Sequence, residues 1–285
     1  MTKTALVTGM DSNANARAIC SSLLKHDYQV VATAEDVFTP DSQERRLFDE
    51  AHRDLPAVVF EAVDFSSTES LSNLIQRLAC RQYDVVINCT TFLALTPDGS
   101  LRDEGAEFDV REFSRVLQAS VTPVAALCLG LKDQLRPGGS IINVTSSAAK
   151  EGAFATISYN ASKAAIESLT KSLANVLGPS KGIRANSIAP GWIPPSPDSA
   201  ADGVVAIANA LTPSVARGTP QDVVAAVHYL IGSSFHNGSV LTLDGGVSTS
   251  YLPYLLESLQ LRGVDMDETI HTLIDLLSDA KKRLV

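Results

Sequence analysis

Short apolar runs rich in β-branched residues alternate with longer segments of helical period along most of this 285-residue chain. The runs that we expect to be strands are Thr4–Thr8, Gln29–Thr33, Val58–Ala62, Asp84–Asn88, Ser140–Thr145, Ile183–Ala189 and Ser239–Leu243. Between them, apolar residues recur every three or four positions, which predicts helices over Ala18–Lys25, Thr68–Arg81, Glu112–Leu131, Tyr159–Leu177 and Pro220–Ile231. Strands that are nearly continuous apolar runs are covered on both faces. The pattern therefore predicts a doubly wound α/β fold with helices on both faces of a parallel sheet.

The sequence gives no sign of an internal domain boundary, because it contains neither a low-complexity linker nor a repeat. We expect residues 1–246 to form a single domain, followed by a C-terminal helical extension over residues 247–285. Two helices are predicted in the extension, near Leu252–Arg262 and Asp267–Arg283. An apolar stripe on the second helix must pack either on its own subunit or on a neighbour, and it consists of Ile270, Leu273, Ile274, Leu277 and Leu284.

The charge balance excludes several classes of partner. The chain has 23 Lys and Arg against 32 Asp and Glu, a net charge of −9, so we expect no nucleic acid and no anionic membrane as partner. We also expect no signal peptide, no transmembrane helix and a cytoplasmic location. The four cysteines lack the spacing of metal ligands, so we expect reduced thiols and no metal site.

The turn after the first expected strand, Thr8 to Asn15, is the first candidate for binding. In a dinucleotide fold, glycines in this turn let the backbone approach the pyrophosphate at a helix N-terminus. Only Gly9 is present here, and Asn13 and Asn15 stand where the later glycines would be. Asparagine tolerates positive φ better than other non-glycine residues, so the turn could still form. By itself, the turn is equally typical of a helix cap without a ligand.

A serine, a tyrosine and a lysine form the second candidate. Ser146 follows an expected strand, Tyr159 comes thirteen residues later, and Lys163 four residues after that. A spacing of four places Tyr159 and Lys163 on one helix face, where the ammonium should lower the phenol pKa from about 10. Tyr159 could then exchange a proton with a substrate oxygen that Ser146 holds by a hydrogen bond. In isolation, such a Tyr/Lys pair is also common on exposed helix faces.

In combination and in this order, the motifs resemble the short-chain dehydrogenase/reductase family over residues 3–246. The matching pieces are Thr8-Gly9, Asp64-Phe65, Val86-Ile87-Asn88, Ser146, Tyr159 with Lys163, Asn186 with Ala189-Pro190-Gly191, Arg217-Gly218-Thr219-Pro220, and Leu241 to Gly246. The resemblance implies a Rossmann-type, three-layer fold and a nicotinamide cofactor. It also implies a homodimer or homotetramer built through the helix that carries Tyr159 and the helix before it.

The resemblance further implies roles for individual residues. Tyr159 and Lys163 would transfer the proton, with Lys163 also at the nicotinamide ribose, and Ser120 stands where the family has an asparagine that supports a proton relay. Asp64 would hold the adenine, and Asn88 would lie beside the adenosine ribose. The cofactor-binding residues implied in all are Gly9, Asp11, Asn13, Asn15, Ala34, Glu35, Asp64, Phe65, Asn88, Tyr159, Lys163, Pro190, Gly191 and Ile193.

Two acidic residues at the end of the second expected strand bear on the choice of cofactor. Glu35 and Asp36 can accept hydrogen bonds from ribose hydroxyls and repel a 2′-phosphate, so we expect NAD(H) to be favoured, with NADP(H) possible. The segment Trp192 to Ala216 contains no Lys or Arg, which predicts a small, neutral, partly apolar substrate.

These observations predict an oxidoreductase that moves a hydride between a nicotinamide cofactor and a carbonyl or alcohol carbon, with Tyr159 as the acid/base. Two alternatives stay open. The missing glycines and Ser120 are also consistent with a redox-inactive binding or regulatory protein. Tyr159 could instead serve a proton-transfer enzyme without redox chemistry, such as a dehydratase or isomerase.

Overall fold

The computed structural model describes residues 2–10, 13–34, 58–96, 102, 104–105, 107–152, 156–193, 212–214 and 217–249. Its strands are β1 (Lys3–Val7), β2 (Tyr28–Ala34), β3 (Val59–Ala62), β4 (Tyr83–Asn88), β5 (Leu135–Val144), β6 (Arg184–Pro190) and β7 (Val240–Leu243). They form one seven-stranded sheet in the order β3-β2-β1-β4-β5-β6-β7, and every neighbouring pair is parallel. The predicted doubly wound fold is confirmed.

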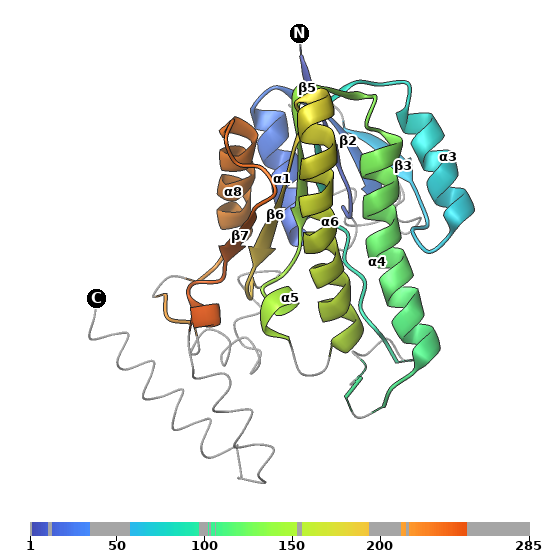
Figure 1. The fold of residues 1–285 in the computed structure, drawn as a ribbon, viewed down its shortest axis with the longest axis vertical. Helices are drawn as coiled ribbons and strands as arrows, with labels where there is room; N and C mark the ends of the chain where they lie inside the picture. The colour runs from blue at the N-terminus through green and yellow to red at the C-terminus, as the bar shows by residue number, and fades with distance from the viewer. Residues whose placement is uncertain are drawn as a thin grey trace.

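Helices cover both faces of this sheet (Figure 1). They are α1 (Ala14–Lys25), α3 (Thr68–Leu78), α4 (Val110–Gly130), α5 (Ala148–Glu151), α6 (Ile157–Lys181) and α8 (Pro220–Gly232), followed by the short 3-10 helix η2 (Val247–Thr249). Helices α1 and α8 share one apolar core with the sheet, whereas α3, α4 and α6 share the other. The central strands are buried on both sides, which explains why they are continuous apolar runs.

Helices α1 and α4 begin earlier than predicted, each behind a polar side chain that caps its first turn. Helix α1 begins at Ala14, because the side chain of Asn13 accepts a hydrogen bond from a backbone N–H of the first turn. Helix α4 begins at Val110 for the same reason, with Asp109 as its cap. Apolar periodicity locates the buried face of a helix, but it does not register such caps. The predicted helices of the C-terminal extension lie outside the described residues.

Helix α4 is long and apolar enough to pass a length-and-composition test for a membrane span, with a mean hydropathy of 1.2. In the fold it lies beside α6 and α3 on one face of the sheet (Figure 1). Its buried side chains include Val116, Val124 and Leu127, which belong to the core on that face. The hydropathy of α4 is therefore that of a helix that contributes to a protein core.

Two histidines meet where α1 packs against α8. The ring centroids of His26 and His228 are 4.5 Å apart, and Ser22 Oγ lies 2.8 Å from His228 Nε2. Burial, and secondarily His26, lower the pKa of His228 from its ordinary 6.5. Below pH 6.5 the unfolded chain therefore binds a proton at His228 more readily than the folded chain does. The contribution of His228 to the free energy of unfolding is complete above pH 6.5 and is lost as the pH falls below that value.

We expect the free energy of unfolding to decrease less between pH 7.5 and pH 5.5 in His228→Gln than in the wild type. Urea unfolding at both pH values measures the difference. His236→Gln serves as the control, because His236 contacts Tyr229 and lies apart from the His26 pair. An equal decrease in the wild type and in His228→Gln would contradict the prediction.

Candidate active site

The candidate site lies at the carboxyl edge of the sheet, where β1 and β4 end side by side. From β1 the strand order continues to β2 and β3 on one side, and from β4 it continues to β5, β6 and β7 on the other. Ligands of open α/β sheets bind outside the carboxyl ends of the strands at this kind of switch point. Gly9 follows β1 and Ser146 follows β5, so the fold places both at this edge.

Gly9 allows the turn after β1 to pass close against the end of β4. Its φ is +81°, and a Cβ at this position would lie 3.0 Å from the backbone N and Cα of Thr90. Thr8 joins the same two segments, because its Oγ1 accepts hydrogen bonds from the N–H of Cys89 at 3.0 Å and from the hydroxyl of Thr90 at 2.9 Å. A larger residue at position 9 would separate the two segments.

Asn13 and Asn15 do not replace glycine in the way expected from the sequence. Asn13 has φ −134° and Asn15 lies in α1; Asp27 is the only non-glycine residue with positive φ in the described part of the chain. Asn13 Oδ1 accepts from the N–H of Asn15 at 2.9 Å, and Asn13 Nδ2 donates to the carbonyl of Cys89 at 2.8 Å. The idea of positive φ at these positions is wrong: side-chain hydrogen bonds hold the turn instead.

Ser146, Tyr159 and Lys163 are brought together as their spacing predicts. Tyr159 and Lys163 lie one turn apart on α6, and Lys163 Nζ is 5.5 Å from the centroid of the Tyr159 ring. An interaction of the Ser146 hydroxyl with the Tyr159 phenol by itself lowers the phenol pKa. The three side chains thus place a proton donor, a second hydrogen-bonding hydroxyl and a cation at one point of the carboxyl edge.

The net pKa of Tyr159 shifts in the direction opposite to the sequence-based expectation. Burial raises the pKa from its ordinary 10 and outweighs the interaction with Ser146. The expectation that Lys163 lowers the phenol pKa is therefore wrong for the protein without a ligand. Desolvation disfavours the phenolate, so Tyr159 is protonated at neutral pH and available as a proton donor.

Lys163 is buried, with 1% of its surface exposed. Its Nζ donates to the carbonyl oxygens of Thr90 at 3.2 Å and Val144 at 3.3 Å. Burial lowers the pKa of Lys163 to about 8, because the ammonium loses its hydration. An ammonium has three donors, so these two carbonyls leave one for a ligand as far as the described residues show. Burial also raises the pKa of the neighbouring Cys89 thiol to about 12, which keeps it neutral.

Asn88 has a structural position that the motif resemblance did not indicate. Its side chain is 3% exposed, and its Nδ2 donates to Asn143 Oδ1 at 2.7 Å inside the protein. Asn143 Nδ2 in turn donates to Thr170 Oγ1 on α6 at 2.8 Å. The Asn88 side chain therefore links β4, β5 and α6, and its place beside the adenosine ribose stays a prediction.

Two other implied residues follow β3. Asp64 is exposed, and hydrogen bonds from the hydroxyl and the N–H of Ser66 lower its pKa, so it is an ionised acceptor at neutral pH. The neighbouring Phe65 is buried and packs edge-on against Phe92, with ring centroids 6.4 Å apart. Asp64 can therefore meet a ligand, whereas the Phe65 side chain belongs to the core.

Ser120 is buried on α4, and its Oγ has no hydrogen-bond partner among the described residues. Pro123, one turn later in the same helix, has no N–H to offer the carbonyl of Ala119. The structure thus places a buried serine hydroxyl at the position for which the resemblance implied a proton relay, and the relay stays a prediction. It does not bring the Ser120 hydroxyl into a hydrogen bond with Lys163.

The turn after β6 is packed closely against the end of β7. The N–H of Gly191 donates to the carbonyl of Leu243 at 2.8 Å, and a Cβ on Gly191 would lie 2.7 Å from the Cα of Asp244. The Pro190 carbonyl accepts from the N–H of Ser147 at 2.9 Å, which places this turn beside Ser146. Ile193 packs against the core that α1 and α8 share. Ala34 is buried at the end of β2, and Asp11 and Glu35 lie outside the described residues.

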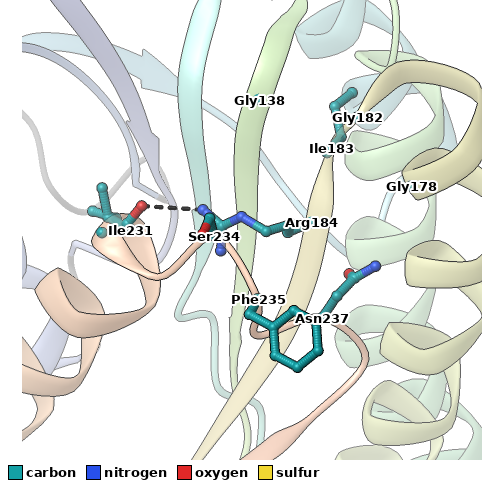
Figure 2. A pocket seen from close by; sticks show the side chains of 10 residues that line it. Gly138, Gly178, Gly182, Ile183, Arg184, Ile231, Ser234, Phe235 and Asn237 are labelled. Atoms are coloured by element: carbon teal, nitrogen blue, oxygen red, sulfur yellow. Dashed lines mark hydrogen bonds between the residues drawn. The ribbon is translucent and has the colours of Figure 1, made fainter.

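Two hollows lined by described residues bear on where a ligand could bind. A hollow of about 180 Å³ adjoins Ser146 and is also lined by Lys150, Glu151 and Glu167. A hollow of about 570 Å³ lies at the opposite, amino edge of the sheet, between the start of β6 and the loop before β7 (Figure 2). Arg184 in the larger hollow donates to the carbonyl of Ile231 at 3.0 Å. The larger hollow is therefore remote from Tyr159 and Lys163.

The sequence reasoning missed Glu104, whose carboxylate is buried against the residue before Tyr159. No local motif marks Glu104, since its partner is 54 positions away. The sequence reasoning also missed the carbonyl of Thr90 as a partner of Lys163, because the type of a residue does not show which backbone carbonyl accepts a hydrogen bond.

Comparison with known proteins agrees with this geometry. A family model described as enoyl-(acyl carrier protein) reductase matches residues 12–248. The short-chain dehydrogenase/reductase FrzI of Cladobotryum sp is 32% identical over 263 residues, which cover 87% of this chain and 96% of that relative.

Two solved structures share the fold. 4-hydroxyisoleucine dehydrogenase complexed with NADH has a TM-score of 0.72 at 23% identity, covering 87% of this chain and 99% of that chain. BdcA in complex with NADPH has a TM-score of 0.71 at 20% identity, covering 85% of this chain and 93% of that chain. At these identities the two structures establish the fold alone. With the family model spanning most of its length, this chain is a member of the short-chain dehydrogenase/reductase family of oxidoreductases.

Proposed function

We propose that the protein transfers a hydride between a nicotinamide cofactor and a carbonyl or alcohol carbon of a small, neutral, partly apolar substrate. The observation that carries the proposal is the joint placement of Ser146, Tyr159 and Lys163 beside the Gly9 turn. Tyr159 gives a proton to the substrate oxygen during reduction and takes it back during oxidation. Ser146 holds that oxygen, and Lys163 supplies positive charge close to the phenol.

The residues present fit a dinucleotide. Gly9 keeps the start of the turn free of side-chain bulk, and α1 directs the positive end of its dipole toward the same edge. Lys163 has a donor left for a ribose hydroxyl, and Asp64 is an ionised acceptor after β3. The bound nicotinamide supplies the hydride chemistry. The complexes of the two structural neighbours, one with NADH and one with NADPH, support this class of cofactor.

We expect kcat/KM for NADH to exceed that for NADPH by about tenfold or more, a difference of roughly 1.4 kcal/mol. Glu35 and Asp36 follow β2 in the sequence and would repel a 2′-phosphate. Arg17 is the nearby cation that could favour NADPH, but its guanidinium donates a hydrogen bond to the carbonyl of Met10 at 3.0 Å. A panel of ketones, alcohols and enones assayed with both cofactors in both oxidation states measures the preference.

The variant Glu35→Ser should narrow this preference, while Glu69→Ser on α3 serves as a control with the same change of charge. A tenfold preference for NADPH in the wild type would contradict the prediction. Failure of both cofactors to bind would favour the redox-inactive alternative. Product formation without any change in nicotinamide absorbance would favour proton transfer alone.

We also propose a homodimer or homotetramer formed through α4 and α6. Both helices keep large apolar side chains exposed, including Leu129 on α4 and Val176 on α6. Exposed apolar surface on two neighbouring helices is typical of a subunit interface. An acyl carrier protein is a poor partner by comparison, because the net charge of −9 would repel an acidic protein.

A further inference from the structure

Helix α6, which carries Tyr159 and Lys163, begins without a capping side chain of its own. Thr156 at the N-cap makes no side-chain cap hydrogen bond, and its hydroxyl lies 3.2 Å from Asn160 Oδ1 instead. The first turn of α6 also contains no acidic residue. Since the first N–H groups of a helix have no acceptor within the helix, the start of α6 needs an acceptor from another part of the chain.

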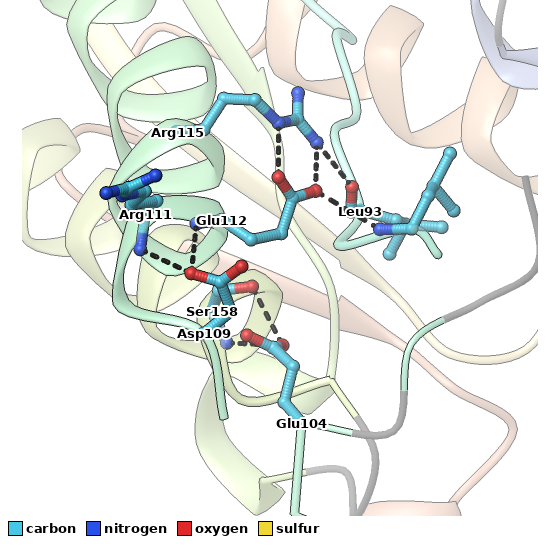
Figure 3. A network of polar contacts seen from close by, with 8 residues as sticks. Leu93, Glu104, Asp109, Arg111, Glu112, Arg115 and Ser158 are labelled. Carbon is cyan, nitrogen blue, oxygen red and sulfur yellow. Dashed lines mark hydrogen bonds and ion pairs between the residues drawn. The ribbon is translucent and has the colours of Figure 1, made fainter. Parts of the chain in front are cut away.

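Glu104 supplies that acceptor from the segment between β4 and α4 (Figure 3). Its Oε2 accepts hydrogen bonds from the N–H of Ser158 at 2.9 Å and from the hydroxyl of Ser158 at 2.8 Å. The residue is 3% exposed, so water competes little for these bonds. A carboxylate at a helix N-terminus is further stabilised by the helix dipole. Glu104 therefore fixes the backbone and the side chain of the residue that directly precedes Tyr159.

The chain directly after β4 is fastened to α4. Arg115 forms two hydrogen bonds with the carboxylate of Glu112, at 2.9 and 2.7 Å, and a third with the carbonyl of Leu93 at 2.9 Å (Figure 3). Glu112 also accepts a hydrogen bond from the N–H of Leu95 at 3.2 Å. These contacts hold residues 93–95 against α4, and the N–H of Arg102, two residues before Glu104, donates to the carbonyl of Ala94 at 3.0 Å.

The same segment contacts the catalytic helix at a second point. The carbonyl of Thr90 accepts a hydrogen bond from Lys163 Nζ, and Glu104 accepts two from Ser158. Beyond Lys163, α6 is held by core side chains such as Ile166 and Leu173. Its first turn has no equivalent set of buried apolar residues, since Ile157 is exposed and Tyr159 is only partly buried. The orientation of Tyr159 thus depends more on Glu104 than the orientation of Lys163 does.

We propose that Glu104 is a positioning residue of the active site, whose buried carboxylate holds the first turn of α6 so that the Tyr159 phenol meets Ser146. The proposal rests on the proposed function, in which Tyr159 transfers the proton. Glu104 itself touches neither Tyr159 nor Lys163. Its loss frays the first turn and lets the phenol turn away from the substrate oxygen, while Lys163 keeps its place.

The test begins with kinetics of three variants. We expect Glu104→Ala to lower kcat at least about tenfold and to leave the cofactor KM within about twofold, because misplacement of a reacting group affects the chemical step. Glu104→Gln retains a carbonyl oxygen for Ser158 and should restore kcat to within about threefold of the wild type. Glu107→Ala is the matched control on the same segment, since its side chain is 78% exposed, and its kcat should be unchanged.

Hydrogen–deuterium exchange of the full-length protein gives a second readout that needs no activity. Glu104→Ala should accelerate exchange in the first turn of α6, residues 157–161, and leave the second half of the helix and α1 unchanged. Unchanged exchange in the first turn would overturn the capping role. Faster exchange with an unchanged kcat would overturn the positioning role. If Glu104→Ala does not fold, Ser158→Ala tests the capping role instead, because it removes the hydrogen bond from the hydroxyl and keeps the one from the N–H. It should accelerate exchange in the first turn of α6 to a smaller extent. Unchanged exchange in Ser158→Ala would overturn the capping role.

If the wild type shows no hydride transfer with any substrate, that result contradicts the proposed function and says nothing about the capping role of Glu104. The exchange experiment still decides the capping role in that case, because it compares folded proteins without turnover. The two failures are therefore distinguishable.

Discussion

Replacing Tyr159 by phenylalanine is expected to lower kcat by roughly 10²–10⁴-fold, the usual contribution of a general acid–base group. The change removes the phenol oxygen and leaves the ring beside Lys163. The interaction of the phenol with Ser146 is lost, but Lys163 keeps its bonds to the carbonyls of Thr90 and Val144. Cofactor affinity should therefore stay close to that of the wild type. Steady-state kinetics together with a fluorescence titration of the cofactor measure both quantities.

Tyr229→Phe is the matched control for this variant. Tyr229 is exposed on α8, where its hydroxyl lies 3.1 Å from His236 Nδ1, far along the sheet from the candidate site. Its kcat should equal that of the wild type. A Tyr159→Phe enzyme that retains half of the wild-type rate would show that the phenol transfers no proton in the rate-limiting step.

Replacing Lys163 by methionine should abolish turnover and weaken cofactor binding together, because one ammonium serves both the phenol and the ribose in the proposed function. Methionine keeps an unbranched apolar chain of similar length in a fully buried position. Lys171→Met on the same helix is the control, since Lys171 is exposed. A variant with normal cofactor affinity would contradict the role of Lys163 at the ribose.

Lys163→Met also tests, through the free energy of unfolding, the effect of burying the Lys163 ammonium. The unfolded chain holds the Lys163 proton up to about pH 10.5, whereas the folded chain releases it near pH 8. Between these values the unfolded state binds more protons, so raising the pH favours the folded state. The wild type should therefore gain free energy of unfolding relative to Lys163→Met from pH 8 to pH 10.5, by up to about 3 kcal/mol. Urea unfolding at pH 7.5 and pH 10 measures this, and a constant difference would contradict it.

The sheet could be predicted from the sequence because its strands are buried on both faces. Val85 to Ile87 in β4 and Ile141 to Ile142 in β5 are continuous apolar runs for that reason, and no polar alternation obscures them. The pairing of Tyr159 with Lys163 could be predicted for a different reason. A helix fixes the relative direction of two residues four positions apart, whatever the rest of the fold does.

Apart from the helix caps, the contacts that the sequence did not reveal join residues far apart in the chain. Asn13 bonds to Cys89 across 76 positions, and Glu104 bonds to Ser158 across 54. The motif of Asn88 predicts a place beside the ribose but does not reveal that its side chain donates to Asn143 on the neighbouring strand. Side chains such as Asn and Glu are compatible with many environments, and only the tertiary structure selects one. The pKa of Tyr159 was misjudged for the same reason, because desolvation depends on packing and not on spacing.

The turn between β1 and α1 has a thermodynamic consequence for ligand binding. Thr8 and Asn13, at the two ends of this turn, are tied to Cys89 and Thr90 through three hydrogen bonds, so both ends are fixed before any ligand arrives. A glycine-rich turn loses conformational entropy when it closes on a phosphate, whereas the ends of this turn have already lost that freedom during folding. Dinucleotide association here should accordingly show a smaller unfavourable entropy than association with a turn built from three glycines.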